Sequence, residues 1–167
     1  EFRRVLFRSE MCTEKIMIIG ANNAGLAVAQ NLYQSGKNFE ITMIDKNKDI
    51  GYLGCGTPIF LSQPGRSYQA FFNKDVAEIK QHLTRLYTET TVEKIDFKHK
   101  QVLINNSQGQ QQLTYDKLVL ATGAEQVSLG IAGHELQGIY QIKNLQEGLE
   151  VERHLASDDV KIGRAHV

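Results

Sequence analysis

The sequence predicts an α/β fold in which a parallel sheet is joined to a small antiparallel β-meander. One observation is a strand, a glycine-rich turn, a helix and a second strand within about thirty residues, which is the pattern of a βαβ unit. The other is a group of short strand-like runs further along the chain, two of them separated by the hairpin-type turn Asn106-Ser107-Gln108-Gly109.

The βαβ unit occupies the first part of the predicted domain. An apolar, β-branched run over residues 15–19 predicts a buried parallel strand that ends at Gly20. Small and apolar residues recur at helical spacing over 24–33 and predict a helix. The next strand is predicted over 39–44 and ends at Asp45.

The later elements follow from the same periodicity arguments. Residues 47–56 form a glycine-rich loop, and residues 117–120 are predicted as a second buried strand. The remaining predicted helices are 57–61, 75–83 and 145–155, and the remaining predicted strands are 86–96, 101–105, 110–113 and 139–142.

Length, net charge and cysteine content limit the classes of function to consider. The chain has 167 residues, enough for one domain with a core, and its formal net charge is zero. A net charge of zero gives no reason to expect binding to nucleic acid, and no apolar run has the length of a membrane span. Two cysteines, Cys12 and Cys55, form neither a disulfide framework nor a metal-ligand spacing, which favours a reducing, cytoplasmic setting.

The two ends are unusual. Codons that encode the residues 162–167 have a reverse complement that encodes Arg3-Arg4-Val5-Leu6-Phe7-Arg8, and the nucleotide string resembles a sequencing adapter. Residues 1–9 and 162–167 are therefore expected to be adapter-derived tails. The alternative is a genuine basic arm at the N-terminus.

The first glycine turn has the form G-x-N-x-x-G, with Gly20, Asn22 and Gly25. Gly20 allows a tight turn, Gly25 allows close packing of helix on strand, and the start of the helix offers free amides to a diphosphate. Asp45 is placed to accept the hydroxyl groups of an adenosine ribose. The pattern indicates a dinucleotide site, and the alternative is that the glycines serve packing only.

Cys55 lies between Gly54 and Gly56, just before the predicted helix 57–61. Glycines on both sides let the backbone approach a planar ring, and the start of a helix favours a thiolate. These features indicate redox chemistry, whereas an inert buried thiol is the alternative. A third motif, Ala121-Thr122-Gly123, ends the strand 117–120 at the carboxyl edge of the sheet, where open α/β folds bind ligands.

Together these motifs resemble the pyridine nucleotide–disulfide oxidoreductase superfamily of flavoproteins. Within it they are most similar to the single-cysteine branch of NADH oxidases, NADH peroxidases and coenzyme A–disulfide reductases. The matching segments are Ile19 to Gly25, Ile50 to Gly56 and Thr114 to Gly123. No cysteine lies five residues after Cys55, unlike the C-x₄-C pair of the glutathione reductase type.

The resemblance implies a Rossmann-like FAD-binding domain in truncated form. It implies FAD as cofactor and NADH as co-substrate, with Cys55 and Asn23 as the catalytic residues. The residues expected to bind FAD are Gly20, Asn22, Asn23, Ala24, Gly25, Asp45, Lys46, Cys55, Val92, Ala121, Thr122 and Gly123. Residues 10–125 are expected to be the N-terminal part of the FAD domain, and 126–161 a linker and the start of the NADH domain.

Two departures from the family bear on the reaction. Oxidases and peroxidases of this branch usually carry His where this chain has Asn23, and an amide cannot exchange a proton near neutral pH as His can. The family's second glycine fingerprint, for NADH, is absent and would begin just after Val160.

The sequence thus predicts the N-terminal part of an FAD-dependent NADH oxidoreductase. Electrons would pass from NADH through FAD and Cys55 to dioxygen, peroxide or a small disulfide, with dioxygen slightly favoured. The expected partners are small-molecule substrates, without nucleic acid or membrane, and the full-length protein is expected to be a homodimer or higher oligomer. The alternative is an adenine-dinucleotide-binding module without redox turnover.

Overall fold

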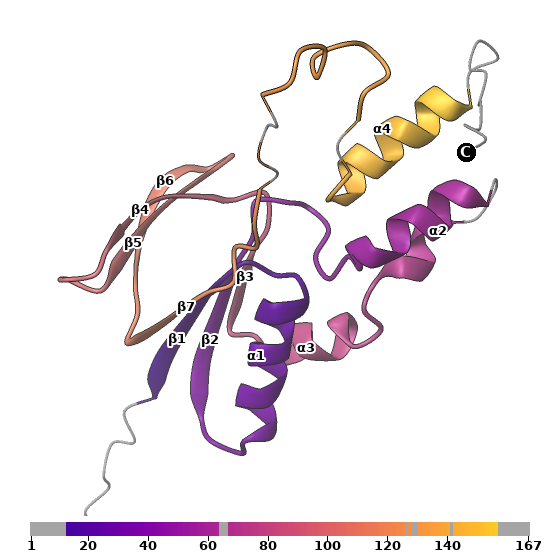
Figure 1. Cartoon of the computed structure of the whole chain (residues 1–167). Coiled ribbons are helices and arrows are strands. Elements are labelled where there is room, and N and C mark those ends of the chain that lie inside the picture. The colour runs from indigo at the N-terminus through magenta and orange to yellow at the C-terminus, as the bar shows by residue number, and fades with distance from the viewer. Residues whose placement is uncertain (1–12, 64–66, 126, 128–129, 141, 157–167) are drawn as a thin grey trace, which may run out of the picture.

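The computed structural model describes residues 13–63, 67–125, 127, 130–140 and 142–156. The predicted tails, 1–9 and 162–167, lie outside this range. Within it the chain forms two sheets and four α-helices, with two short 3₁₀ turns (Figure 1). The elements are β1 (Glu14–Ile19), α1 (Asn23–Gln34), β2 (Phe39–Ile44), η1 (Gly54–Gly56), α2 (Thr57–Ser62), η2 (Tyr68–Phe71), α3 (Val76–His82), β3 (Arg85–Tyr87), β4 (Thr91–Asp96), β5 (Gln101–Asn106), β6 (Gly109–Thr114), β7 (Lys117–Leu120) and α4 (Leu145–Leu155).

The larger sheet is parallel throughout its described strands and has the order β3-β2-β1-β7. In its register Ile19 lies between Ile44 of β2 and Leu120 of β7. The carboxyl ends of these three strands therefore lie at one edge. This edge is where the predicted motifs begin.

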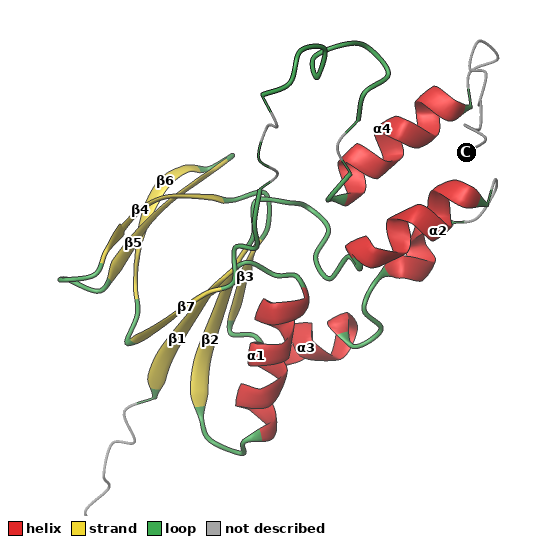
Figure 2. Cartoon of the chain, viewed as in Figure 1, coloured by secondary structure: helices red, strands yellow, loops and turns green. Residues whose placement is uncertain are grey.

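The parallel sheet is covered by different layers on its two faces (Figure 2). Ile16 and Ile18 of β1 pack with buried residues of α1 and α3, including Leu26. Met17 and Ile19, which point the other way because strand side chains alternate, pack with Ile104 and its neighbours on the antiparallel sheet. A central strand buried on both faces explains the continuous apolar run of β1.

The smaller sheet is the predicted meander, with the order β4-β5-β6 and antiparallel pairing. Asn106 pairs with Gly109 across a two-residue turn, and Gly109 has a positive φ of 99°. The hairpin predicted from Asn106-Ser107-Gln108-Gly109 is confirmed.

The strand predicted over 86–96 is wrong as a single element. β3 pairs with β2 in the parallel sheet, whereas β4 pairs with β5 in the antiparallel sheet. The chain changes sheets around Asp45, whose backbone N–H donates to the carbonyl of Tyr87 and whose carbonyl accepts from the N–H of Thr90. Both halves are extended and each contains apolar or aromatic residues that are common in strands, so periodicity alone does not reveal the change of sheet.

Two further expectations are corrected. β7 was predicted as a buried strand, but Leu120 is 55% exposed, because β7 pairs only with β1 within the described residues and lies at the edge of the sheet. No strand forms at residues 139, 140 and 142, and residue 141 lies outside the described range. Ile139 and Ile142 are exposed and have no neighbouring strand to pair with in the described part.

The loop after β2 leads to a third cluster of buried residues, which lies beyond the two sheets. It consists of Tyr52, Phe60, Phe71 and Leu145, and it joins α2 to α4 (Figure 1).

None of the helices in the described ranges has the length and apolar character needed to cross a bilayer.

Candidate functional site

The turn after β1 is packed against the end of β7 through backbone atoms. Gly20 has a φ of 105°, and a Cβ at this position would lie 2.1 Å from the carbonyl oxygen of Ala121. A Cβ on Gly25 would lie 1.9 Å from the carbonyl oxygen of Gly20. Both positions therefore require glycine, and two of the three predicted motifs meet at the carboxyl edge of the sheet.

The first turn of α1 is open to a ligand. Asn22 is the N-cap residue, but its side chain makes no capping hydrogen bond, and the first turn contains no acidic residue. Asn22, Asn23 and Ala24 are exposed. The first backbone N–H groups of a helix have no intrahelical acceptor, so this end of α1 presents donors and a positive dipole end to an anion.

Asp45 follows β2 beside this turn and is only 8% exposed. Its Oδ2 accepts a hydrogen bond from the N–H of Ala21 at 2.7 Å. Its Oδ1 accepts from the backbone N–H and the side-chain Nδ2 of Asn47, at 2.8 and 2.9 Å. The carboxylate therefore ties the end of β2 to the glycine turn, and each of its oxygens has a protein donor.

Other predicted residues surround the same edge. The ammonium group of Lys46 lies 3.8 Å from a carboxylate oxygen of Glu125, which follows the Ala121-Thr122-Gly123 motif. Both side chains are largely exposed, so this ion pair contributes little stability. Val92 lies on β4 and packs beside the second core cluster, two residues after Thr90, which is bonded to Asp45.

The cysteine loop is attached to the glycine turn. The N–H of Gly51 donates to the carbonyl of Ala21 at 2.9 Å, and Cys55 follows four positions later in η1. The thiol of Cys55 is free and exposed, so it is not the buried thiol of the alternative interpretation. The structure therefore brings the three predicted motifs to one side of the sheet.

The sequence-based prediction did not include several residues that shape this site. Asn47 holds the carboxylate of Asp45, and an Asp-x-Asn sequence at the end of a strand is a signal for such a local turn. The hydroxyl groups of Tyr52 and Thr57 are hydrogen-bonded at 2.6 Å on either side of Cys55 in the sequence. No periodic pattern points to that pair.

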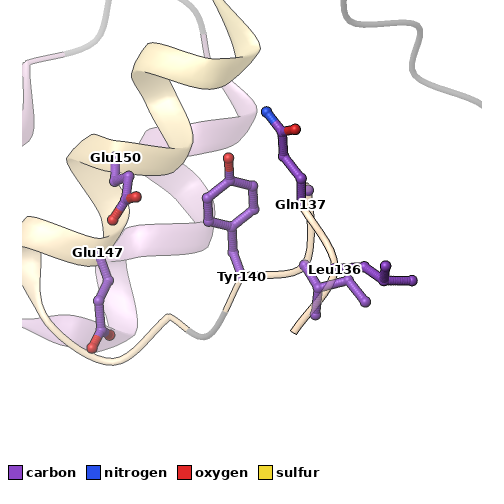
Figure 3. A pocket seen from close by; sticks show the side chains of 7 residues that line it. Leu136, Gln137, Tyr140, Glu147 and Glu150 are labelled. Carbon is purple, nitrogen blue, oxygen red and sulfur yellow. The ribbon is translucent and has the colours of Figure 1, made fainter. Parts of the chain in front are cut away.

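A separate cavity of about 410 Å³ lies between residues 136–140 and α4 (Figure 3). Tyr140, Glu147 and Glu150 line it, and none of the predicted site residues does. A carboxylate oxygen of Glu147 accepts the backbone N–H groups of Lys143 and Asn144, so this side chain caps α4. The cavity is not the predicted dinucleotide site.

Comparison with known proteins identifies relatives of this chain. The chain is 36% identical over 148 residues to an NADH oxidase of Lactococcus lactis subsp. cremoris, covering 88% of this chain and 33% of the relative. It is 29% identical over 149 residues to an NADH oxidase of Methanocaldococcus jannaschii, again covering 88% and 33%. The chain thus spans about one third of the length of these curated relatives.

A solved structure supports the fold. The water-forming NADH oxidase from Lactobacillus brevis, bound to NADH, superimposes with a TM-score of 0.76 at 21% identity, covering 85% of this chain and 32% of that one. At this identity the likeness concerns the fold alone. The family profile described as "Pyridine nucleotide-disulphide oxidoreductase" matches residues 14–163. Since this match covers most of the sequence, the chain belongs to the pyridine nucleotide-disulphide oxidoreductase family.

Proposed function

We propose that the chain is the FAD-binding part of an oxidoreductase that passes electrons from NADH through FAD and Cys55 to a small acceptor. The observation that carries this proposal is the juxtaposition of the open start of α1, the Asp45 carboxylate and the loop of the exposed Cys55. Membership of the family and the names of the relatives support it.

The residues at this edge fit the diphosphate and ribose of FAD. The amides at the start of α1 would hold the diphosphate, because Asn22, Asn23 and Ala24 are exposed and the side chain of Asn22 makes no capping hydrogen bond. Asp45 would accept a ribose hydroxyl through Oδ2, because this oxygen has two lone pairs and accepts one protein N–H, from Ala21, whereas Oδ1 already accepts two hydrogen bonds from Asn47. The remaining residues that would surround the bound FAD are Lys46, Val92, Ala121, Thr122 and Gly123.

When bound, the flavin would supply hydride acceptance and electron transfer, and the protein would supply binding and orientation. Cys55 would act on the acceptor side. With peroxide, its thiolate sulfur would take one oxygen atom and release water after protonation, and the sulfenic acid would then be reduced by two electrons from NADH. With a small disulfide, the thiolate would form a mixed disulfide and release one thiol.

Dioxygen is the acceptor that we slightly favour, and its reduction to two waters consumes two NADH. Asn23 stands where the related oxidases and peroxidases usually have His, so no imidazole would deliver protons there.

We expect the NADH site to lie outside this chain. We further propose small-molecule substrates, a reducing cytoplasmic setting and a homodimer or higher oligomer for the complete protein, with no nucleic-acid or membrane partner.

The test uses a version of the protein that spans the full length of its relatives. We expect it to purify with the yellow colour of bound flavin and to consume NADH in the presence of oxygen. We expect the chain of residues 1–167 to bind added FAD weakly and to show no saturable NADH turnover. A colourless full-length protein that binds adenine nucleotides but leaves NADH unchanged would show that it is a binding module instead.

A further inference from the structure

The turn that carries Cys55 is in contact with chain segments on several sides. A Cβ on Gly56 would lie 2.1 Å from Cδ1 of Phe71, so the ring of Phe71 covers the backbone after the cysteine. A Cβ on Gly54 would lie 3.0 Å from the carbonyl oxygen of Lys143. The segment that leads into α4 therefore lies against the backbone just before the cysteine.

Thr57 anchors the other end of this turn. It is fully buried, and its hydroxyl group is 2.6 Å from the hydroxyl of Tyr52, which is itself buried. Tyr52 forms an isolated antiparallel bridge with Phe72, so its own position is set by backbone pairing. A β-branched side chain is stiff at χ1, and this hydrogen bond further restricts the rotamer of Thr57.

Gly148 of α4 lies directly on the methyl group of Thr57. A Cβ at Gly148 would lie 2.8 Å from Cγ2 of Thr57, closer than two carbon atoms can approach without a shift. Leu145, one turn earlier in α4, is buried in the same cluster as Tyr52 and Phe60. Glycine is unfavourable inside a helix, so the close approach gives a physical reason for its presence there.

We infer that Gly148 is a positioning residue for Cys55, acting through Thr57. The inference rests on the role proposed above for Cys55. α4 follows the FAD-binding motifs in the sequence, yet it packs on the helix that begins at Thr57. The distance between α4 and Thr57 thereby sets the conformation of the turn from Gly54 to Gly56, and with it the place of the thiol.

A methyl group added at Gly148 has few ways to be accommodated. Thr57 is fully buried, and its hydroxyl group is hydrogen-bonded to Tyr52. Either α4 moves away from Thr57 or the start of α2 moves. Both movements disturb the turn, since Lys143 contacts Gly54 just before α4 and Thr57 follows Gly56 directly.

The experiment compares Gly148→Ala, Thr57→Ser, the double variant and the control Gln146→Ala in the 167-residue chain. Gln146 is an exposed residue of the same helix. The rate of Cys55 alkylation by iodoacetamide is measured across the neutral and mildly alkaline pH range. Peptide mass spectrometry separates Cys55 from Cys12. Circular dichroism and denaturant unfolding establish that each variant is folded.

We expect Gly148→Ala to change the alkylation rate constant of Cys55 by about threefold or more and to displace its pH profile. Neither exchanged residue is ionisable, so such a displacement reports the surroundings of the thiol. Serine keeps the hydroxyl that bonds Tyr52 and lacks Cγ2, the atom that the new methyl group would meet. The alkylation rate and pH profile of Thr57→Ser should therefore match those of the wild type. Adding Thr57→Ser to Gly148→Ala should restore the wild-type values, and the control Gln146→Ala should also match the wild type.

A folded Gly148→Ala variant whose rate and pH profile match the wild type would overturn the inference. So would a double variant that is not restored, including one that fails to fold, because the contact with Thr57 would then not be the cause. The measurement needs neither flavin nor NADH. Failure of the proposed enzymatic function would appear in the NADH assay of the full-length protein and would not change these alkylation rates. An unchanged alkylation rate in Gly148→Ala would leave the flavoprotein proposal intact.

Discussion

The carboxylate of Asp45 accepts a hydrogen bond from the backbone N–H of Ala21 at 2.7 Å, which joins the end of β2 to the glycine turn after β1. The carbonyl of the same Ala21 accepts the N–H of Gly51, at the start of the cysteine loop. One residue of the glycine turn thus connects the proposed ribose-binding acid with the proposed redox segment.

Replacing Asp45 with alanine should destabilise the fold by about 1.5–3 kcal/mol, because the N–H groups of Ala21 and Asn47 lose a charged acceptor. Denaturant unfolding of the 167-residue chain measures this loss. Asp49→Ala is the matched control, since Asp49 is exposed on the same loop and should change stability by less than about 0.5 kcal/mol. Equal effects for the two variants would contradict the anchoring role of Asp45. In the full-length protein, Asp45→Ala should also weaken FAD retention.

Gly25→Ala should cost at least about 1–3 kcal/mol, because the new Cβ would overlap the carbonyl oxygen of Gly20. This loss runs against helix propensity, which favours alanine over glycine. Gly36→Ala serves as a comparison in which the added methyl group meets no other atom. Gly36 has a φ of 69° and open space around it, so the expected loss of about 1 kcal/mol in stability should come from backbone conformation and not from a steric clash. Chemical denaturation ranks the two, and a smaller loss at Gly25 than at Gly36 would be the contrary result.

Cys55→Ser in the full-length protein should preserve folding and flavin colour, because Cys55 is exposed and the exchange is nearly isosteric. It should abolish reduction of dioxygen to water and leave at most leakage to hydrogen peroxide. An oxygen electrode combined with a peroxide assay measures both products. Water formation at the wild-type rate in this variant would show that Cys55 has no redox role.

The turn between β4 and β5 gives a pH-dependent prediction. The hydrogen bond from the His99 ring, 2.7 Å from Oδ2 of Asp96, is the main cause that lowers the pKa of Asp96 below its ordinary value of 3.8, and the backbone N–H of His99 adds to it. A carboxyl group whose pKa is lowered by folding stabilises the native state above its unfolded pKa, and this contribution disappears as the pH falls through the folded pKa.

Replacing His99 with alanine keeps the backbone donor and removes the ring, so the pKa of Asp96 should rise toward 3.8. An NMR titration of the Asp96 carboxyl carbon measures the shift, and acid unfolding should begin at a slightly higher pH in the variant. Because the group is exposed, added salt should reduce the difference. An unchanged Asp96 titration would show that the ring does not contribute.

The βαβ unit was predictable because its signals are local. The apolar run of β1, the glycine turn and the acid after β2 each follow from backbone conformation and side-chain period, and the structure has β1, α1 and β2 within two residues of the predicted bounds. The turn between Asn106 and Gly109 was predictable for the same reason. The motif residues Gly20, Asp45 and Ala121 could also be expected at one edge, since parallel strands share their carboxyl ends.

The sequence by itself thus determined the class of fold, the order of most elements and the family to which the chain belongs. Only the tertiary structure decided that residues 85–96 divide between two sheets, that Leu120 lies on an edge, and that Gly148 packs on Thr57 beside the cysteine turn. The physical reason is the distance along the chain over which each signal acts. Propensity and periodicity report on a few neighbouring residues, whereas strand partners and close approaches depend on residues far apart in the chain, which meet only when the whole core is packed.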